Sequence, residues 1–446
     1  ELNKQSYQGE IVLPKTLYNM VGRKSILYTS QFCKTNEKVN IKLVATGTEN
    51  VYSNSIIFQP QTSGVTYWSY IHLINGARIV SSQGATINNI AAPSTTKNVK
   101  IMTIGDSITD LGFYQSHLTR LLAENKVSCK WIGTQHRSDY EEVSFESKSG
   151  GNLSYIATDY NVAKIIEVSG IVVPPSTGYG STEYTDGNGN KWRVNGHILT
   201  ESNGVYSGKI RLVKYERDPN YEGGDADDTT GSNLPSFGVL TKSNNGSGDR
   251  TINYNLISTA SENPLWNPQT KEVDWNYYIT TWGLDVPNIV ILQFGYNEVE
   301  DMSNTNSEGV QIAVSRLKGV VDKLHEQYPN VKIIVGLEIY GANSVGYYNK
   351  FYNSAYPRKF AQLSLYQEWM KALENYSHVV FAPIYARMDD VRGYGLMTEI
   401  AVNDNVYENP MKEIVRVDGF DGVHPLFDYG QKEIAMTYEP IIISMI

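Results

Sequence analysis

The chain has 446 residues, which is enough for a sizeable core and for two domains. Its formal net charge of −9 argues against nucleic acid or an anionic membrane surface as the main partner. We therefore expect a neutral or weakly charged substrate, no nucleic-acid partner and no membrane insertion.

Other features of composition indicate where the protein works. No run approaches the roughly 18 apolar residues that cross a bilayer, and residues 1–10 lack the basic and apolar regions of a signal peptide, so any export signal is absent from this chain. The two cysteines, Cys33 and Cys129, fall in different predicted domains, which argues against a disulfide or a zinc site. We expect both thiols to be buried. The 32 tyrosines favour an exported, sugar-handling protein, so we expect an extracellular or periplasmic location, or association with a virion.

The first 94 residues carry short alternating or β-branched stretches separated by turn residues. These stretches span 10–13, 25–29, 39–45, 55–58, 67–73 and 77–80. None has a sustained helical period. The pattern predicts an all-β, sandwich-like module over residues 1–97, and the Pro, Ser and Thr residues of 91–98 indicate a linker.

From residue 99 onward, apolar strands alternate with amphipathic helices. The predicted strands are 99–104, 128–132, 288–294, 331–337 and 379–383, and the predicted helices are 113–125, 308–327 and 360–374. Such alternation implies a parallel sheet that is covered on both faces. The sequence therefore predicts an α/β fold, a three-layer α/β/α domain, over residues 98–446.

The alternation of strands and helices breaks down between about 160 and 275. Asp-Gly and Asn-Gly steps in 185–194 indicate one hairpin, and the rest is rich in loop-forming residues. The acidic residues Asp225, Asp227 and Asp228 lack the spacing of a calcium-binding loop, so we interpret them as a solvated loop. We predict an irregular insertion that forms a wall over the active edge of the sheet.

A serine follows the predicted strand 99–104. The apolar run 99–104 ends in Gly105, and Asp106 and Ser107 come next. Open α/β sheets bind their ligands at the carboxyl edge of the strands, and a serine on a strand-to-helix turn is exposed there. Ser107 is therefore a candidate nucleophile, provided that a base lies close to it.

The best candidate for that base is His424, one of seven histidines. Histidine has an unperturbed pKa close to neutrality. Asp421 stands three residues before His424, and Pro425 follows directly, which is typical of a turn. An aspartate in this position accepts the proton on Nδ1, so that Nε2 faces the serine.

Ester hydrolysis also needs donors for the oxygen that becomes negative. Two candidates lie near predicted strand ends or turns. Asn297 follows the strand 288–294, and a flexible turn at 149–152 contains Gly150 and Gly151. Together with the N–H of Ser107, they make a plausible oxyanion hole.

These residues occur in the order of the four blocks of a known family. Gly105 to Ser107, the Gly150 turn, Gly295 to Asn297 and Asp421 to His424 resemble the SGNH, or GDSL-like, hydrolases, and the resemblance extends over 99–446. In the first block, Ile108 stands where leucine is usual, and in the third, Glu298 stands where aspartate is usual. Gly150 is preferred over Gly151 because Glu146 matches a family glutamate four residues earlier.

The resemblance implies a role for each matched position. Ser107 would be the nucleophile, His424 the base and Asp421 its orienting acid, with an oxyanion hole formed by the N–H groups of Ser107 and Gly150 and the side chain of Asn297. It also implies a flavodoxin-like α/β/α fold and no metal or other cofactor. With the β module in front, the chain looks like carbohydrate-active SGNH esterases of gut bacteria and their phages.

The function predicted from these features is hydrolysis of an ester through an acyl-enzyme, with O-acetyl groups on a glycan as the expected substrate. Each block alone is typical of an ordinary turn or helix cap, and it is their joint order that favours catalysis. A lipase or thioesterase is an alternative, but it would predict an apolar insertion. A carbohydrate-binding or phage-tail module without catalysis is another, and the presence of Ser107, Asp421 and His424 argues against it.

Overall fold

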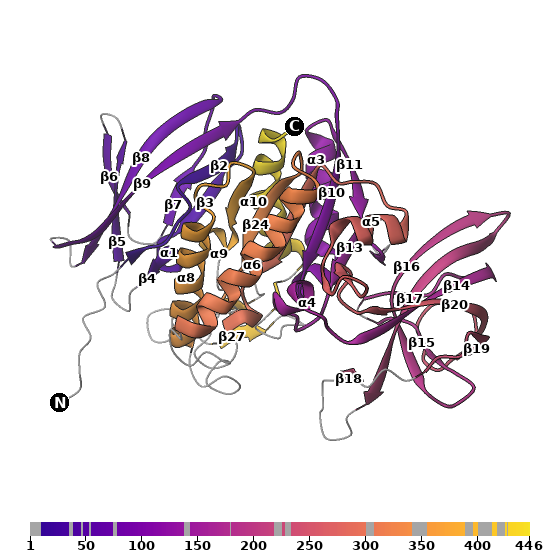
Figure 1. Ribbon diagram of the computed structural model, residues 1–446. Coiled ribbons are helices and arrows are strands. Elements are labelled where there is room, and N and C mark those ends of the chain that lie inside the picture. The colour runs from indigo at the N-terminus through magenta and orange to yellow at the C-terminus, as the bar shows by residue number, and fades with distance from the viewer. Residues whose placement is uncertain are drawn as a thin grey trace, which may run out of the picture.

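The computed structural model describes residues 10–34, 39–45, 48–52, 55–74, 78–137, 143–178, 180–217, 225–227, 233–299, 307–340, 355–388, 396–399, 413–416, 424–425 and 427–446. Three parts are arranged in a row (Figure 1). The N-terminal β module lies at one end, the domain with most of the helices is central, and the insertion forms the other end. The predicted acid Asp421 lies outside the described residues.

The central sheet is mostly parallel. Its strands run in the order β12-β13-β10-β23-β24-β25, with β11 also paired to β10, and β12–β13 is its one antiparallel pairing among the described strands. The bounds are β10 (Lys97–Gly105), β11 (Val127–Ile132), β12 (Gln135–Arg137), β13 (Val143–Ser147), β23 (Ile289–Phe294), β24 (Lys332–Leu337) and β25 (Val379–Pro383). The strand β23 is buried along its whole length, which explains its unbroken apolar sequence.

Helices cover both faces of this sheet. The helices α3 (Phe113–Glu124) and α10 (Lys432–Ser444) share a core cluster with Ile101 and Ile291, whereas α6 (Ser307–Gln327) and α8 (Ala355–Ala372) share another with Met102 and Val290. Neighbouring residues of one strand therefore point to opposite faces, as the two-residue period of a strand requires. The shorter elements are α2 (Ser107–Asp110), α4 (Ser154–Ala157), α5 (Trp275–Trp282), η1 (Asn297–Val299), α9 (Ile384–Arg387), η3 (Phe427–Gln431), β21 (Trp266–Asn267), β22 (Glu272–Val273), β26 (Leu396–Glu399) and β27 (Glu413–Arg416).

The N-terminal strands form one five-stranded sheet in the order β2-β9-β8-β5-β6 and two small pairs, β1–β4 and β3–β7. Their bounds are β1 (Glu10–Ile11), β2 (Thr16–Met20), β3 (Ser25–Tyr28), β4 (Cys33–Lys34), β5 (Val39–Ala45), β6 (Thr48–Tyr52), β7 (Ser55–Phe58), β8 (Gly64–Ile74) and β9 (Arg78–Ile90). One short helix that the sequence pattern does not predict, α1 (Thr29–Phe32), interrupts them. Phe32 and Tyr70 belong to the same core cluster as Trp369 of α8, so the module packs firmly on the central domain.

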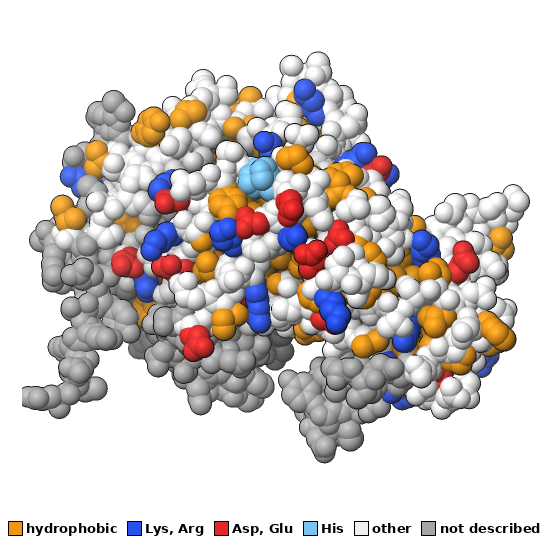
Figure 2. All heavy atoms as spheres, viewed as in Figure 1, with side chains coloured by type: hydrophobic (Ala, Val, Ile, Leu, Met, Phe, Trp, Pro, Cys, Tyr) orange, Lys and Arg blue, Asp and Glu red, His pale blue; other side chains and the backbone are white. Residues whose placement is uncertain are grey.

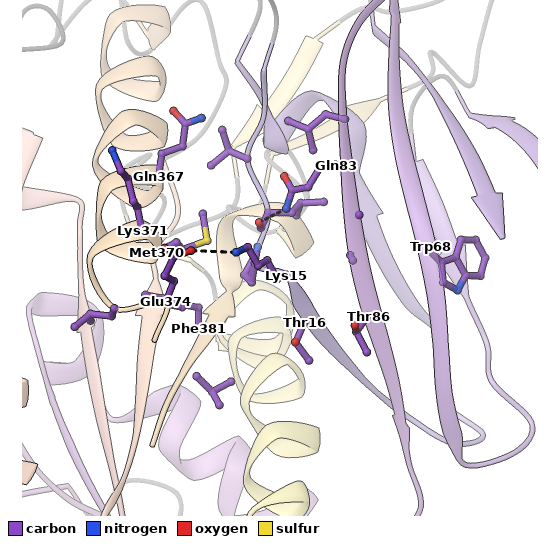
Figure 3. Close-up of a pocket in the computed structure, with 18 of the residues that line it drawn as sticks. Lys15, Thr16, Trp68, Gln83, Thr86, Gln367, Met370, Lys371, Glu374 and Phe381 are labelled. Atoms are coloured by element: carbon purple, nitrogen blue, oxygen red, sulfur yellow. Dashed lines mark hydrogen bonds and ion pairs between the residues drawn. The ribbon is translucent and has the colours of Figure 1, made fainter. Parts of the chain in front are cut away.

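A groove of about 1360 Å³ separates parts of the module from the central domain (Figure 3). Residues 10–16, β8, β9, α8 and β25 line it. Lys15 Nζ and Glu374 Oε2 lie 3.0 Å apart and join the two sides. The groove includes the first residue of β25, Val379, so it lies toward the amino ends of the strands, opposite the edge that carries Ser107.

The insertion is regular, which corrects the prediction of an irregular segment. Its seven strands run in the order β14-β20-β19-β15-β16-β17-β18, and an additional pairing of β14 with β17 closes the first six into a barrel. The bounds are β14 (Val162–Ile171), β15 (Glu183–Thr185), β16 (Lys191–Ser202), β17 (Val205–Arg217), β18 (Asp225–Asp227), β19 (Phe237–Lys242) and β20 (Thr251–Ser261). The predicted hairpin is confirmed as the antiparallel pair β15–β16.

Composition concealed the barrel, because its strands contain many polar residues. In β20 the side chains from Thr251 to Asn255 alternate between exposed and buried, with Ile252 and Tyr254 inward. A separate core that includes Trp192, Ile210 and Leu240 fills the interior. The insertion is therefore a small folded unit rather than a loop.

The surface carries both signs of charge. Figure 2 shows acidic and basic side chains interspersed on the face that carries α6 and α8. No helix in the described part of the chain is long and apolar enough to cross a membrane. Cys33 is buried as predicted, but Cys129 is only half-buried, because it lies in β11, where buried and exposed positions are mixed.

Candidate active site

The carboxyl ends of four parallel strands bring the candidate residues to one edge of the sheet. Gly105, at the end of β10, is in register with Ser147 of β13 and Gln293 of β23. Phe294 is in turn in register with Leu337 of β24. The segments that carry Ser107, Gly150, Asn297 and Glu338 therefore leave the sheet at the same edge.

Ser107 is the first residue of α2 and is half-buried. Asp106 caps this helix, since its Oδ1 accepts a hydrogen bond of 2.9 Å from the N–H of Ile108. The residue before the turn must be glycine, because a Cβ on Gly105 would lie 2.1 Å from Thr109 Oγ1 and 2.7 Å from the carbonyl oxygen of Gln293. The sharp turn thus holds the hydroxyl at the edge.

His424 lies 317 residues further along the chain, and its Nε2 is 2.8 Å from Ser107 Oγ. A serine hydroxyl can donate to a neutral imidazole nitrogen at this distance. The position of the ring is supported by the next residue, because the Gln431 side chain donates to the carbonyl of Pro425 at 3.3 Å, immediately before α10. The sequence-predicted serine and histidine are therefore in contact, whereas the role of Asp421 stays a prediction.

The two glycines of the turn at 148–151 differ in the hydrogen bonding of their N–H groups. The N–H of Gly151 donates to the carbonyl of Lys148 at 2.7 Å and so closes the turn. Gly150 has a φ of +70°, which favours glycine, and its N–H has no protein acceptor among the described residues. This geometry favours Gly150 as the available donor.

The Asn297 side chain joins three of the four sequence blocks. Its Nδ2 donates to Asp106 Oδ2 and to the carbonyl of Gly151, each at 2.9 Å. Both amide hydrogens are therefore engaged within the protein, and one of these bonds must open before Asn297 can donate to a substrate. The next residue, Glu298, accepts a hydrogen bond from the N–H of Leu153, so the glutamate fixes the segment that follows Gly151.

Three buried carboxyl groups lie beneath this arrangement. Burial raises the pKa of Asp106 to about 6 and that of Glu298 to about 7, and it holds the pKa of Glu338 well above its usual range. Glu338 accepts a hydrogen bond of 2.9 Å from the N–H of Tyr296 and lies beside Asp106, whose charge also raises the pKa of Glu338. Burial and the neighbouring carboxyl groups therefore favour the protonated form of Glu338 in the folded chain.

Sequence reasoning missed Glu338, although a signal was present. The residue directly follows the apolar run of β24, and an acid at the carboxyl end of a buried parallel strand lies at the functional edge. What the sequence could not indicate is its contact with Asp106, 232 residues away by numbering.

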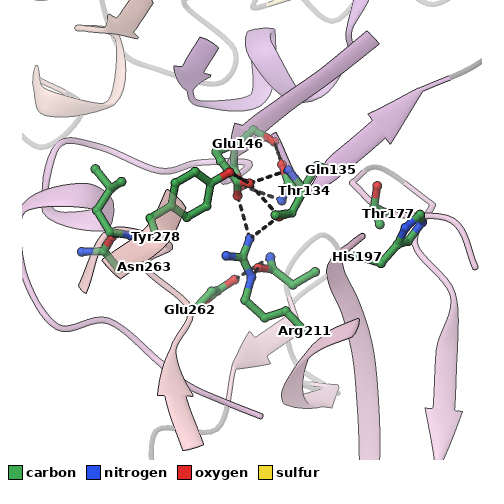
Figure 4. Close-up of polar contacts among 12 residues, drawn as sticks. Thr134, Gln135, Glu146, Thr177, His197, Arg211, Glu262, Asn263 and Tyr278 are labelled. Atoms are coloured by element: carbon green, nitrogen blue, oxygen red, sulfur yellow. Dashed lines mark hydrogen bonds and ion pairs between the residues drawn. The ribbon is translucent and has the colours of Figure 1, made fainter. Parts of the chain in front are cut away.

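A second polar network connects the site to the barrel (Figure 4). The carboxylate of the fully buried Glu146, in β13, accepts hydrogen bonds from the Thr134 N–H at 2.7 Å, the Thr134 hydroxyl at 2.6 Å and the Tyr278 hydroxyl at 2.6 Å. Arg211 of β17, which is 1% exposed, completes the set with an Nη2–Oε2 distance of 2.7 Å. Glu146, which we match to a family position from the sequence, thus also forms an ion pair with Arg211 of the insertion.

A second ion pair lies one step closer to the turn. Lys148 Nζ and Glu262 Oε1 are 2.9 Å apart, and Asn161 Nδ2 donates to the other oxygen of Glu262 at 2.7 Å. The ion pair ties the insertion to the segment that leads to Gly150, and the bond from Asn161 holds Glu262 in place within the insertion. Within the described ranges, no group of three or more His, Cys, Asp or Glu side chains is arranged to hold a metal ion.

The chain was compared with known proteins. No protein-family description matches the sequence, and no curated protein is significantly similar to it. Solved structures that resemble it include a family 3 carbohydrate esterase of Clostridium thermocellum (14% identity, TM-score 0.36) and one of Talaromyces cellulolyticus (13%, 0.36). Each comparison covers 78% of this chain and 97% of the other.

A third structure is described as a peptidoglycan O-acetylesterase, with 12% identity, a TM-score of 0.31 and coverage of 78% of this chain and 91% of the other. In its four sequence blocks, the chain resembles the SGNH, or GDSL-like, hydrolases.

Proposed function

We propose that the protein is a serine esterase that works through an acyl-enzyme and removes O-acetyl groups from a carbohydrate. The observation that carries this proposal is the 2.8 Å distance between Ser107 Oγ and His424 Nε2 at the carboxyl edge of a parallel sheet. In the first step, Ser107 Oγ attacks the ester carbonyl carbon while its proton moves to His424 Nε2. The bond to the leaving oxygen then breaks, and His424 gives its proton to that alcohol.

Water completes the cycle. His424 takes a proton from the water, whose oxygen attacks the acyl carbon, and the Ser107 oxygen leaves with that proton as the free acid is released. Asp421 would accept the Nδ1–H of His424 and stabilise the imidazolium.

The negative oxygen of each tetrahedral intermediate would be held by the N–H groups of Ser107 and Gly150 and by Asn297. The N–H of Gly150, which has no acceptor among the residues that the structure describes, and the exposed backbone at 149–150 support this assignment. Asn297 would exchange its bond to the Gly151 carbonyl for one to the oxyanion, and keep its bond to Asp106. Removal of one such donor typically lowers the rate by about 10²–10³-fold.

The preference for a small acyl group on a sugar is supported by the polar surroundings of the site. The insertion that borders it presents amide, hydroxyl and charged side chains, and a lipase would need an apolar wall for a long chain. A polymeric glycan also suits the proposed extracellular or periplasmic location.

The test is hydrolysis of p-nitrophenyl esters by the wild-type protein and by Ser107→Ala. We expect acetate to be turned over faster than butyrate and octanoate, and Ser107→Ala to lower kcat by at least about 10³-fold, because the nucleophile is lost. Retained circular dichroism of the variant would exclude unfolding as the cause. Equal rates for both proteins on every ester would refute the serine mechanism, and a preference for octanoate would refute the acetylesterase.

A further inference from the structure

A second cavity lies between the central domain and the barrel, and we call it the insertion cavity. Its volume is about 640 Å³, which is within the range of small-molecule binding sites. Its central-domain wall is formed by Asp110, Gln135 and residues 147–149, and its other walls come from 160–161 and from the barrel side, including Glu183 and Arg193. It belongs to neither domain alone.

The cavity borders the candidate active site at two places. Ser147, Lys148 and Ser149 lead directly into Gly150, and Asp110 is the last residue of the helical turn that begins with Ser107. A hydrogen bond of 2.8 Å from the Ser147 hydroxyl to Asp110 Oδ1 joins these two borders. Ser107 itself is not part of the lining, so a molecule in the cavity would lie beside the reacting ester rather than on it.

The lining is suited to hydroxyl groups. Its side chains include the amides of Gln135, Asn161, Asn195 and Asn244, and among the described residues of the lining Val194 is the only aliphatic one. Amides both donate and accept, as sugar hydroxyls do. The ring of Tyr160 adds one aromatic face of the kind on which a sugar can lie.

The charges of the lining are mixed in sign. It contains three carboxylates, on Asp110, Glu183 and Glu262, and two cations, on Lys148 and Arg193. Lys148 is already paired with Glu262 at 2.9 Å. A cavity without an excess of positive charge does not favour an anionic ligand, and one so poor in apolar side chains does not favour an acyl chain.

The geometry points to the insertion cavity as the binding site for the sugar units next to the acylated one, in a neutral oligosaccharide substrate. This inference rests on the proposed function, because it assigns a binding site to the glycan substrate of that reaction. The barrel is then a specificity element, which binds the chain while Ser107 and His424 act on its ester. A small ester does not reach the cavity and would not use it.

The experiment compares two substrates in two variants of the full chain. Glu183→Ala/Arg193→Ala removes two half-buried side chains of opposite charge that stand in register on β15 and β16, so the net charge is unchanged. Glu167→Gln is the matched control, because it changes an exposed side chain on β14 of the same barrel, outside the lining. The substrates are p-nitrophenyl acetate and chemically acetylated xylo- and cello-oligosaccharides.

We expect the double variant to lower kcat/KM for the best oligosaccharide at least tenfold relative to kcat/KM for p-nitrophenyl acetate, through KM, because hydrogen bonds to charged groups are lost. Glu167→Gln should leave this ratio unchanged. Calorimetry with the same oligosaccharide, on a Ser107→Ala background, should give a matching loss of affinity and separates binding from catalysis. Circular dichroism shows whether the double variant is folded, and Arg193→Gln is the milder replacement if it is not.

The outcomes separate the two proposals. If the wild-type protein hydrolyses p-nitrophenyl acetate through Ser107 but the ratio and the affinity do not change in the double variant, the cavity is not the glycan site and the esterase proposal stands. Activity on p-nitrophenyl acetate without hydrolysis or binding of any oligosaccharide overturns the inference in the same way. If Ser107→Ala has no effect on either substrate, the proposed function itself fails.

Discussion

Two groups of buried acidic side chains flank the candidate active site, and they differ in how their charge is handled. Glu146 and Glu262 each have a cationic partner, Arg211 at 2.7 Å and Lys148 at 2.9 Å. Asp106, Glu298 and Glu338 have no ion pair with Lys or Arg among the described residues, and their pKa values are raised by burial. The first group faces the barrel, whereas the second lies at the ends of the sheet strands.

The difference corresponds to two ways of fixing the same edge. On the sheet side, burial favours carboxyl groups that keep their proton, and Glu338 accepts from the Tyr296 N–H beside Asp106. On the barrel side, ion pairs join two parts that are distant in sequence, such as β13 and β17. Breaking such a pair leaves a bare charge in the interior, whereas replacing a neutral carboxyl leaves none.

The largest effect is expected for Arg211→Met, which removes the cation from the fully buried Glu146. Breaking a buried pair on one side typically costs about 3–5 kcal/mol, because the remaining charge is uncompensated. We expect a loss of that size in the free energy of unfolding, measured in urea at pH 7. Activity on p-nitrophenyl acetate should fall as well, because β13 leads into the Gly150 turn.

The double variant Arg211→Met/Glu146→Gln is the control for this prediction. Glutamine can still accept from Thr134 or Tyr278, and no charge stays buried, so we expect at least half of the lost stability to return. A loss below about 1 kcal/mol in the single variant would contradict the view that this pair holds the barrel to the central domain.

The sequence predicts the contact between Ser107 and His424 because each residue lies in a short local pattern. A strand, Gly105 and the capping Asp106 fix the serine turn within a few residues, and Pro425 follows the histidine. Parallel strands bring such turns to one edge without further information. Helices and strands also follow local patterns, and the predicted bounds of helix 308–327 and strand 331–337 differ from those of α6 and β24 by only one residue each.

The barrel and the carboxyl pair could not be predicted in the same way. Closure of the barrel depends on the pairing of β14 with β17, and the contact of Asp106 with Glu338 joins the ends of two strands that are not neighbours in the sheet. Both are long-range contacts without a local pattern. Exposed polar residues on alternate positions of β20 also hid its two-residue period behind a composition typical of loops.

A smaller effect, with a defined dependence on pH, is expected for Glu338→Gln. Because burial holds the pKa of Glu338 in the folded chain well above that in the unfolded chain, we expect this residue to make the protein less stable as pH rises through and above the unfolded-state value. The slope is about 1.4 kcal/mol per pH unit for each retained proton. Glutamine can donate to Asp106 and accept from Tyr296, so the variant should keep its fold and lose about 2 kcal/mol less between pH 5 and 7.

Urea unfolding at several pH values measures this difference, with Glu167→Gln as an exposed control. In the variant, the free energy of unfolding should still decline with pH, but more weakly, because the pKa values of Asp106 and Glu298 are also raised. The charge of His424 acts on Asp106, and the charge of Asp106 acts on Glu298. Parallel stability curves for the variant and the wild-type protein would mean that Glu338 is ionised in the folded state.

The smallest effect is expected for Lys148→Met. Its partner Glu262 is buried, but it keeps hydrogen bonds from Asn161 at 2.7 Å and Asn195 at 3.4 Å, and the Lys148 side chain is 15% exposed. Water and two amides therefore replace part of what the cation supplies, and we expect a loss of about 1 kcal/mol in the free energy of unfolding. A loss as large as that of Arg211→Met would mean that exposure of the cation does not matter here, and that both barrel-side pairs act as fully buried ones.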